Sequence, residues 1–141
     1  MATLGNIVFY ADDPIRLSDF WAEVFRYPPQ RIDGEFREML LASGLSEEQL
    51  DRRGLVESAD GTGPRLFFHH ADGPKAGRNR VHIDVHAVEG RPPTDEELDA
   101  EKDRLVALGA TVVRLVDQSW GPVHEHYYQL RDPEGNEFCL Q

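Results

Sequence analysis

Two short stretches of this 141-residue chain carry titratable side chains in a pattern that could do chemistry. Residues 80–86 alternate, so that His82 and Asp84 share one face of a strand and apolar residues share the other. Glu137 and Cys139 likewise share a face of the final stretch. Imidazole, carboxylate and thiol groups transfer protons and bind transition metals. The pattern therefore predicts a polar sheet face that either holds a ligand or simply meets solvent.

The net charge of the chain limits the classes of partner that it can bind. With 15 basic and 26 acidic residues the formal net charge is −11, which repels phosphate backbones and anionic lipid surfaces. We therefore expect a small-molecule ligand or substrate, and neither nucleic acid nor membrane. No leader pattern opens the sequence, no apolar stretch approaches the ~18 residues of a membrane span, and Cys139 is the single cysteine, so no intrachain disulfide can form. These features predict a cytoplasmic location.

Local signals in the first half of the chain predict strands around one long helix. Asp13 followed by Pro14 is typical of a helix start, and Ser46 begins a capping box. If Leu66 and Phe68 pack under the helix, their neighbours must face the other way. The predicted elements are a strand at 4–10, a helix from 14 that ends before the prolines at 28 and 29, strands at 38–42 and 65–69, and a short helix inside the loop 43–64.

The second half repeats this order after a connector at 71–79. We expect the basic residues of the connector to balance nearby acids, with a site for an anionic substrate as the alternative. Thr94 and Glu97 form a second capping box, and Gly109 ends the helix, whose apolar stripe is Leu98, Leu105 and Leu108. The predicted elements are strands at 80–86, 111–116, 124–130 and 137–140 and a helix at 94–108. The order βαβββ thus occurs twice.

Several sequence blocks, in this order, resemble a known family. The blocks are Asp13-Pro14 with Asp19-Phe20-Trp21, then residues 79–85, 108–111 and 132–138. Together they are similar to the glyoxalase-like domain branch of the vicinal oxygen chelate (VOC) superfamily, the glyoxalase/bleomycin resistance protein/dioxygenase family. The resemblance implies an α+β fold in which two βαβββ modules form a curved, partly closed mixed sheet around a cleft, with the helices outside. It also implies a single domain, 1–141, with modules at 1–72 and 78–141.

The resemblance also implies positions for a metal, which this chain fills incompletely. Metal-dependent members place His or Glu on the first and last strands of the modules, around a divalent ion such as nickel, zinc or iron. The matching residues here are Asn6, Phe67, His82 and Cys139, of which only His82 fits the pattern. Glu137 could substitute sterically for Cys139. The usual four-ligand site is therefore not expected, and whether a divalent metal is the cofactor stays open.

The candidate site residues follow from the alternation and the resemblance together. His82 and Glu137 are the predicted acid–base catalysts. Trp120, before a Gly-Pro pair, is read as a lid or a packing residue, and a neighbouring pair such as His69-His70 points to opposite faces. The predicted ligand-binding residues are Asn6, Phe67, His69, Asp84, His86, Trp120 and Cys139.

Three functions remain compatible with the sequence. The first is a glyoxalase-like lyase or isomerase that moves a proton beside a carbonyl without the full metal site. The second is a bleomycin-resistance-like protein that sequesters a bulky, often cationic molecule without transforming it. The third is a divalent-metal-dependent lyase or isomerase. By analogy with the superfamily, we expect a homodimer.

Overall fold

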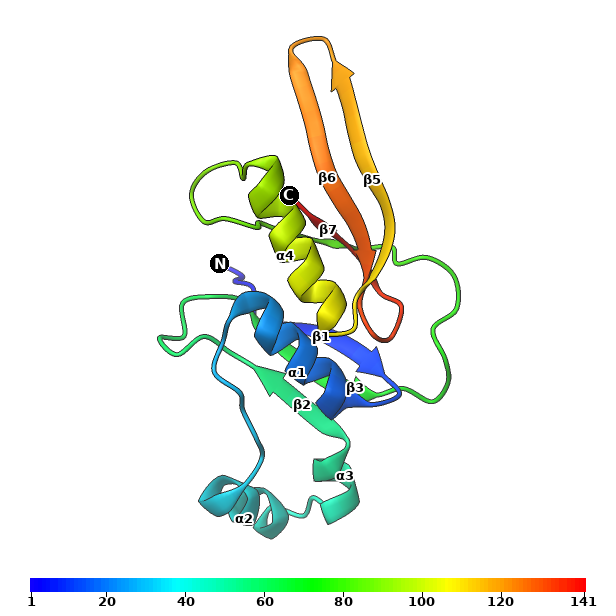
Figure 1. Cartoon of the computed structure of the whole chain (residues 1–141). Helices are drawn as coiled ribbons and strands as arrows, with labels where there is room; N and C mark the ends of the chain where they lie inside the picture. The colour runs from blue at the N-terminus through cyan, green and yellow to red at the C-terminus, as the bar shows by residue number, and fades with distance from the viewer. The chain divides into compact units, whose positions relative to one another are not determined.

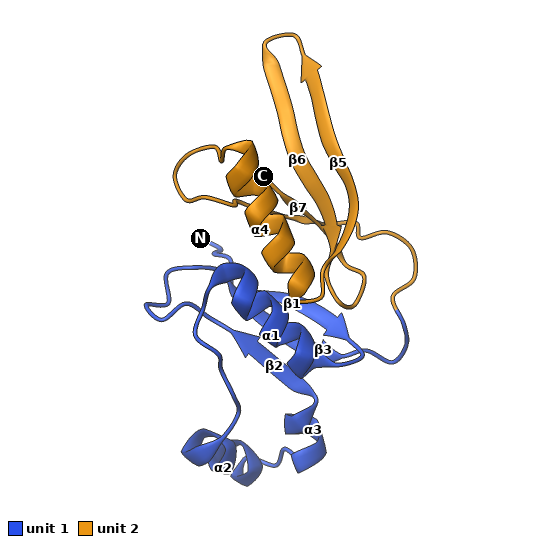
Figure 2. Ribbon diagram, in the orientation of Figure 1, with its two compact units in different colours: residues 1–74 blue, residues 75–141 orange.

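The computed structural model describes residues 1–141, which divide into two units, Met1–Pro74 and Lys75–Gln141 (Figure 2). The first unit contains one mixed three-stranded sheet with three helices. Its elements are β1 (Asn6–Ala11), α1 (Pro14–Phe25), α2 (Gly34–Ala42), α3 (Glu47–Asp51), β2 (Arg53–Val56) and β3 (Arg65–His70). The strand order is β1-β3-β2, with β1 parallel and β2 antiparallel to the central β3.

The helix α1 forms as its sequence predicts. The Asp13 side chain accepts a hydrogen bond from the Arg16 amide at 3.0 Å, and Pro14 occupies the first turn. The helix ends at Arg26, whose backbone is left-handed. On the sheet, Leu66 and Phe68 are fully buried, which confirms the predicted register of β3.

One predicted strand of the first unit is wrong. Residues 38–42 lie in α2, which begins at Gly34, directly after its N-cap Asp33. Glu, Met, Leu, Leu and Ala are all good helix formers and none is β-branched, so a strand there had little local support. The strand that pairs antiparallel with β3 is instead the four-residue β2. Because glycine is unfavourable inside a strand, Gly54 weakens the strand signal, and the segment falls within the predicted loop 43–64. The first unit therefore has one strand fewer than a full βαβββ module.

Gly54 shows how closely β2 approaches α1. A Cβ atom at this position would lie 2.6 Å from Ser18 Cβ and 2.7 Å from the Pro14 carbonyl oxygen. Because backbone cannot retreat as a flexible side chain can, we expect Gly54→Ala to lower the free energy of unfolding by about 1–3 kcal/mol. Urea denaturation measures this loss. Gly5→Ala is the matched control, since a Cβ atom there would meet no other part of the chain within 4 Å, and an equal loss in both variants would contradict the packing.

The second unit is a complete βαβββ module. Its elements are β4 (Ile83–Val85), α4 (Asp95–Ala107), β5 (Thr111–Trp120), β6 (Val123–Arg131) and β7 (Glu137–Leu140). The strand order is β4-β7-β6-β5, with β4 parallel to β7 and the other pairs antiparallel (Figure 1). The predicted α+β class is confirmed, with two mixed sheets that are not closed. No helix of the structure combines the length and apolarity needed to span a bilayer.

The boundaries of the second unit differ from prediction where strand pairing sets them. Only Ile83, Asp84 and Val85 pair with β7, so β4 is shorter than the predicted 80–86, and Val81, expected on the apolar face, is 79% exposed. The β5–β6 hairpin is longer than predicted, because β5 continues to Trp120. The capping box of α4 is present as predicted, and Leu98 and Leu105 are buried. Leu108, predicted in the same stripe, is the C-cap and is exposed.

Candidate functional site

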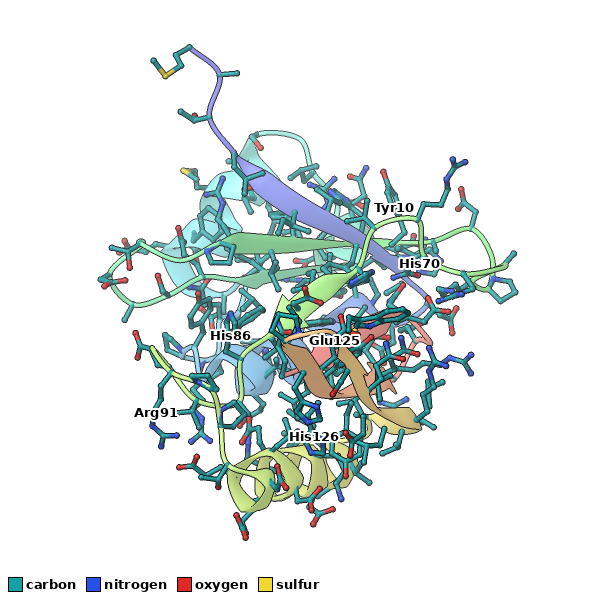
Figure 3. The ribbon with its side chains drawn as sticks, turned by 90° about the horizontal axis from the view of Figure 1, so that it is seen from above. Tyr10, His70, His86, Arg91, Glu125 and His126 are labelled. Atoms are coloured by element: carbon teal, nitrogen blue, oxygen red, sulfur yellow. The ribbon has the colours of Figure 1, made fainter.

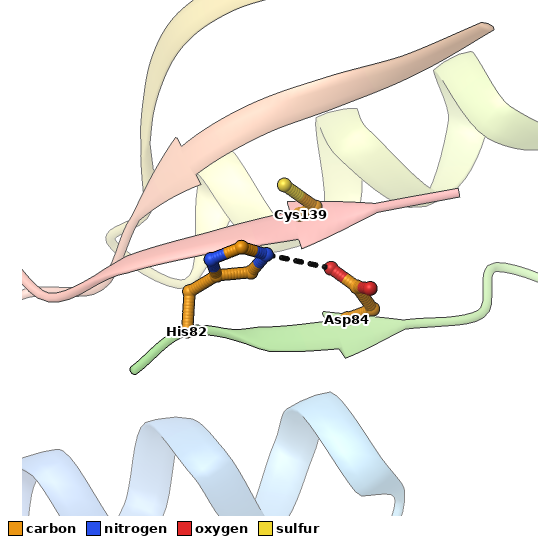
Figure 4. A group of neighbouring side chains, drawn as sticks. All are labelled: His82, Asp84 and Cys139. Carbon is orange, nitrogen blue, oxygen red and sulfur yellow. Dashed lines mark ion pairs between the residues drawn. The ribbon is translucent and has the colours of Figure 1, made fainter. Parts of the chain in front are cut away.

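Three of the predicted site residues meet on the sheet of the second unit. Asp84 on β4 and Cys139 on β7 are direct partners in the parallel pair, and His82 immediately precedes β4 (Figure 4). His82 Nε2 lies 3.3 Å from Asp84 Oδ1. One ligand atom from each of the three side chains falls within 4.8 Å of the others. The alternation seen in the sequence thus becomes a compact imidazole–carboxylate–thiol cluster.

The thiol of this cluster is held in its neutral form. Burial raises the pKa of Cys139, and the neighbouring Asp84 carboxylate raises it further, while Arg114 acts in the opposite direction. Since the thiolate is the reactive nucleophile, Cys139 is a poor nucleophile in this environment. Its sulfur would become a strong donor only toward a metal ion, which displaces the proton.

A cavity of about 380 Å³ opens beside the cluster. His82, Glu137 and Cys139 line it, and so do Arg78, Arg114 and Arg131. Arg114 Nε donates a hydrogen bond of 2.8 Å to Gln129 Oε1, another lining residue, which fixes its orientation. Three arginines around one cavity favour a negatively charged ligand, even in a chain whose net charge is −11.

Glu137 is tied to the connector. Its Oε2 accepts a hydrogen bond from the Asn79 amide at 2.8 Å and lies 3.3 Å from Lys75 Nζ. The backbone hydrogen bond and, to a lesser degree, the lysine lower the pKa of Glu137, so it is a weak base. These contacts favour an anchoring role, in which Glu137 holds the segment that carries Arg78 against β7.

The remaining predicted residues lie elsewhere. Asn6, Phe67 and His69 belong to the sheet of the first unit; Asn6 Oδ1 accepts a 2.6 Å hydrogen bond from Arg65, and the rings of Phe67 and His69 are 5.0 Å apart. His86, just after β4, lines a different cavity. Trp120 is 64% exposed at the end of β5 and donates a 3.0 Å hydrogen bond to Glu125.

The cluster in the second unit offers better zinc ligands than the residues at the metal positions that the family resemblance implies. Asn6 is occupied by Arg65, and Phe67 has no donor atom, so the first unit supplies no good ligand at the two matching positions. In the second unit, His82, Asp84 and Cys139 offer nitrogen, oxygen and sulfur. Two ligands of a tetrahedral zinc ion lie about 3.3–3.5 Å apart. The 3.3 Å between His82 and Asp84 matches this spacing.

A second cluster was missed by the sequence analysis. Asp117 on β5 faces His124 and His126 on β6, and their ligand atoms also lie within 4.8 Å of one another. This face of β6 meets α4, because Tyr128 Oη donates to Asp99 at 2.5 Å. The histidines therefore do not line the face that carries Cys139. The spacing His-x-His on a predicted strand was visible, but its partner Asp117 lies beyond the strand end predicted at residue 116.

Comparison with known proteins places this geometry in a family. Residues 6–141 match the Glyoxalase-like domain family. None of the curated proteins matches the chain. Among solved structures, a glyoxalase/bleomycin resistance protein/dioxygenase family enzyme from Burkholderia phytofirmans PsJN is 18% identical, with a TM-score of 0.64 over 99% of this chain and 97% of that one.

Two further structures share the architecture. The fosfomycin resistance protein FosX from Listeria monocytogenes is 17% identical, with a TM-score of 0.64 over 100% of this chain and 91% of that one. A possible glyoxalase from Bacillus cereus is 13% identical, with a TM-score of 0.58 over 99% of both chains. At these identities the likeness shows the fold alone. With the family match across nearly its whole length, the chain belongs to the Glyoxalase-like domain family of the VOC superfamily.

Proposed function

We propose that this protein binds a small anionic metabolite in the cavity of its second unit and moves a proton on it with His82. The observation that carries the proposal is an imidazole paired with a carboxylate at the edge of a cavity lined by three arginines. The arginines hold the negative group of the ligand, and His82 acts on a proton beside its carbonyl. This is the glyoxalase-like lyase or isomerase function, narrowed to an acidic substrate.

The pairing of His82 with Asp84 supports an acid–base role. With Nε2 turned toward the carboxylate, Nδ1 is the nitrogen that is left to take or give a proton. A carboxylate partner orients an imidazole, as in other acid–base sites. Asp84 does not line the cavity, so it acts as a positioning residue behind His82. Glu137 holds the connector, and Cys139 forms part of the wall.

The arginines support an anionic ligand over the cationic one expected of a sequestering protein. A guanidinium binds carboxylate or phosphonate oxygens through two parallel hydrogen bonds. One FosX structure from Listeria monocytogenes is described in complex with Mn(II) and 1S,2S-dihydroxypropylphosphonic acid, an anionic small molecule. Binding without reaction nevertheless remains the alternative that an experiment must separate.

Anion binding can be tested by isothermal titration calorimetry with methylphosphonate and pyruvate as probes. Hydrogen bonds to charged groups contribute about 1.5–3 kcal/mol, so we expect Arg114→Gln to weaken binding about 10–100-fold. Arg52→Gln is the matched control, because Arg52 pairs with Glu48 on the surface of the first unit. Equal affinities in the two variants would count against the anion site.

The proton-transfer step can be followed without knowledge of the natural substrate. In D₂O, a base that removes protons from the methyl group of pyruvate, next to its carbonyl, causes those protons to be replaced by deuterium. NMR detects this exchange. We expect His82→Ala to remove the catalysed exchange while pyruvate still binds, and Asp84→Asn to reduce it. His70→Gln, on the first unit, should leave it unchanged. If pyruvate and methylphosphonate bind but wild type exchanges no faster than buffer, the sequestering function is favoured.

A metal-dependent lyase or isomerase is the second candidate, because His82, Asp84 and Cys139 fit a zinc ion. Those three residues would hold it, and a bound zinc would polarise a carbonyl oxygen of the ligand. Elemental analysis of untagged protein decides between the two: one metal per chain, lost in Cys139→Ser, favours this candidate. Assembly as a homodimer and the joining of both units in one domain also stay proposals, which gel filtration and limited proteolysis address.

A further inference from the structure

The β5–β6 hairpin carries a second cluster of metal-ligating side chains, outside the cavity described above. Asp117 and His126 are direct cross-strand partners, and His124, two positions before His126, lies on the same face of β6. His124 Nε2 lies 3.4 Å from Asp117 Oδ1, and His126 Nδ1 lies 3.7 Å from Asp117 Oδ2. One carboxylate is thus approached by one nitrogen from each of two imidazoles.

These separations resemble the spacing of two ligands around one metal ion. Zinc lies about 2.0–2.2 Å from nitrogen and oxygen ligands, so two tetrahedral ligands are about 3.3–3.5 Å apart. One contact has this spacing, and the other is slightly wider.

In each histidine, the ring nitrogen that does not face Asp117 contacts another side chain. His124 Nδ1 lies 3.1 Å from Ser119 Oγ, and His126 Nε2 lies 3.4 Å from Asp95 Oδ1 at the start of α4. Metal-ligating histidines commonly donate their second ring N–H to a carboxylate or another acceptor, which fixes the tautomer that exposes the other nitrogen to the metal. The two independent partners therefore orient both imidazoles toward Asp117.

We propose that Asp117, His124 and His126 bind a divalent transition-metal ion, for which zinc has the best-matched ligand preference. The ligand atoms are a carboxylate oxygen, Nε2 of His124 and Nδ1 of His126, with Asp95 as the outer partner. Three protein ligands leave a fourth position open. His124 and His126 line a cavity of about 540 Å³, so water or a small ligand can reach that position. Figure 3 labels four residues of its wall: His86, Arg91, Glu125 and His126.

The site can be tested with Zn²⁺ and Co²⁺ as probes of the full-length, metal-stripped chain. We expect calorimetry with Zn²⁺ to show a site that the double variant His124→Gln/His126→Gln lacks, and Asp95→Asn to weaken that site about 10–100-fold. Asp103→Asn is the matched control. Asp103 lies on the same helix as Asp95, and its exposed carboxylate contacts Lys102. A Zn²⁺ titration of the double variant that equals that of wild type would overturn the proposal.

Two spectroscopic readouts separate this site from the cluster around Cys139. Co²⁺ bound by nitrogen and oxygen alone lacks the sulfur-to-metal absorption that a thiolate ligand produces. We expect the double variant to lose the sulfur-free component only. In wild-type protein, Zn²⁺ should shift the ring ¹⁵N resonances of His124 and His126, and unshifted resonances at saturating Zn²⁺ would also refute the site.

Discussion

Trp21→Ala is expected to lower the free energy of unfolding of the first unit by about 3–5 kcal/mol. Trp21 is 1% exposed and lies in the middle of an aromatic cluster, with ring centroids 5.3 Å from Phe9, 5.8 Å from Phe20 and 5.7 Å from Phe25. Removing the indole leaves a cavity between α1 and β1 that rigid neighbouring rings cannot fill. Urea unfolding followed by circular dichroism measures the loss.

The chain has only one other tryptophan, and it provides the control. Trp120 is 64% exposed, so Trp120→Ala should change stability by less than about 1 kcal/mol. In that variant, all tryptophan fluorescence comes from Trp21 and reports on the first unit. If the two variants were equally stable, the assignment of Trp21 to the core would be wrong.

Asp132→Ala is expected to destabilise the second unit by about 2–4 kcal/mol, because it removes the buried acceptor of the turn before β7. Asp132 is 3% exposed. Its Oδ1 accepts 2.9 Å hydrogen bonds from the amides of Glu134 and Asn136, and its Oδ2 accepts one of 2.8 Å from the Asn136 side chain. Since this turn sets the start of β7, the variant should also disturb the position of Cys139. Urea denaturation and the NMR shifts of Cys139 measure the two effects.

Asp60 offers a control with similar hydrogen bonds but without burial. Its carboxylate accepts from the Thr62 amide and from the hydroxyls of Ser58 and Thr62 in an exposed turn of the first unit. Water can replace these partners, so Asp60→Ala should cost clearly less than Asp132→Ala. A similar loss in both would show that burial of the turn contributes little.

Signals that act over a few residues were readable in the sequence. The Asp13-Pro14 start of α1 and the capping box at Thr94 depend on hydrogen bonds to the next turn, so they formed as predicted. The alternation around Asp84 and Cys139 required only that two strands pair side by side, which the βαβββ order implied. These local rules were enough to indicate the family and the first cluster.

What the tertiary structure alone decided depends on partners distant in the chain. Arg53–Val56 became the strand β2 because it pairs with β3, a choice that its own residues, with Gly54 among them, do not indicate. The fold also brought Arg78 and Arg114 to one cavity, and Asp117 to His124. The cross-strand register and the length of the β5–β6 hairpin determine which of these residues lie close together. The sequence by itself therefore determined which residues could do chemistry, whereas strand pairing determined which of them meet, because pairing couples segments that local physical rules treat as independent.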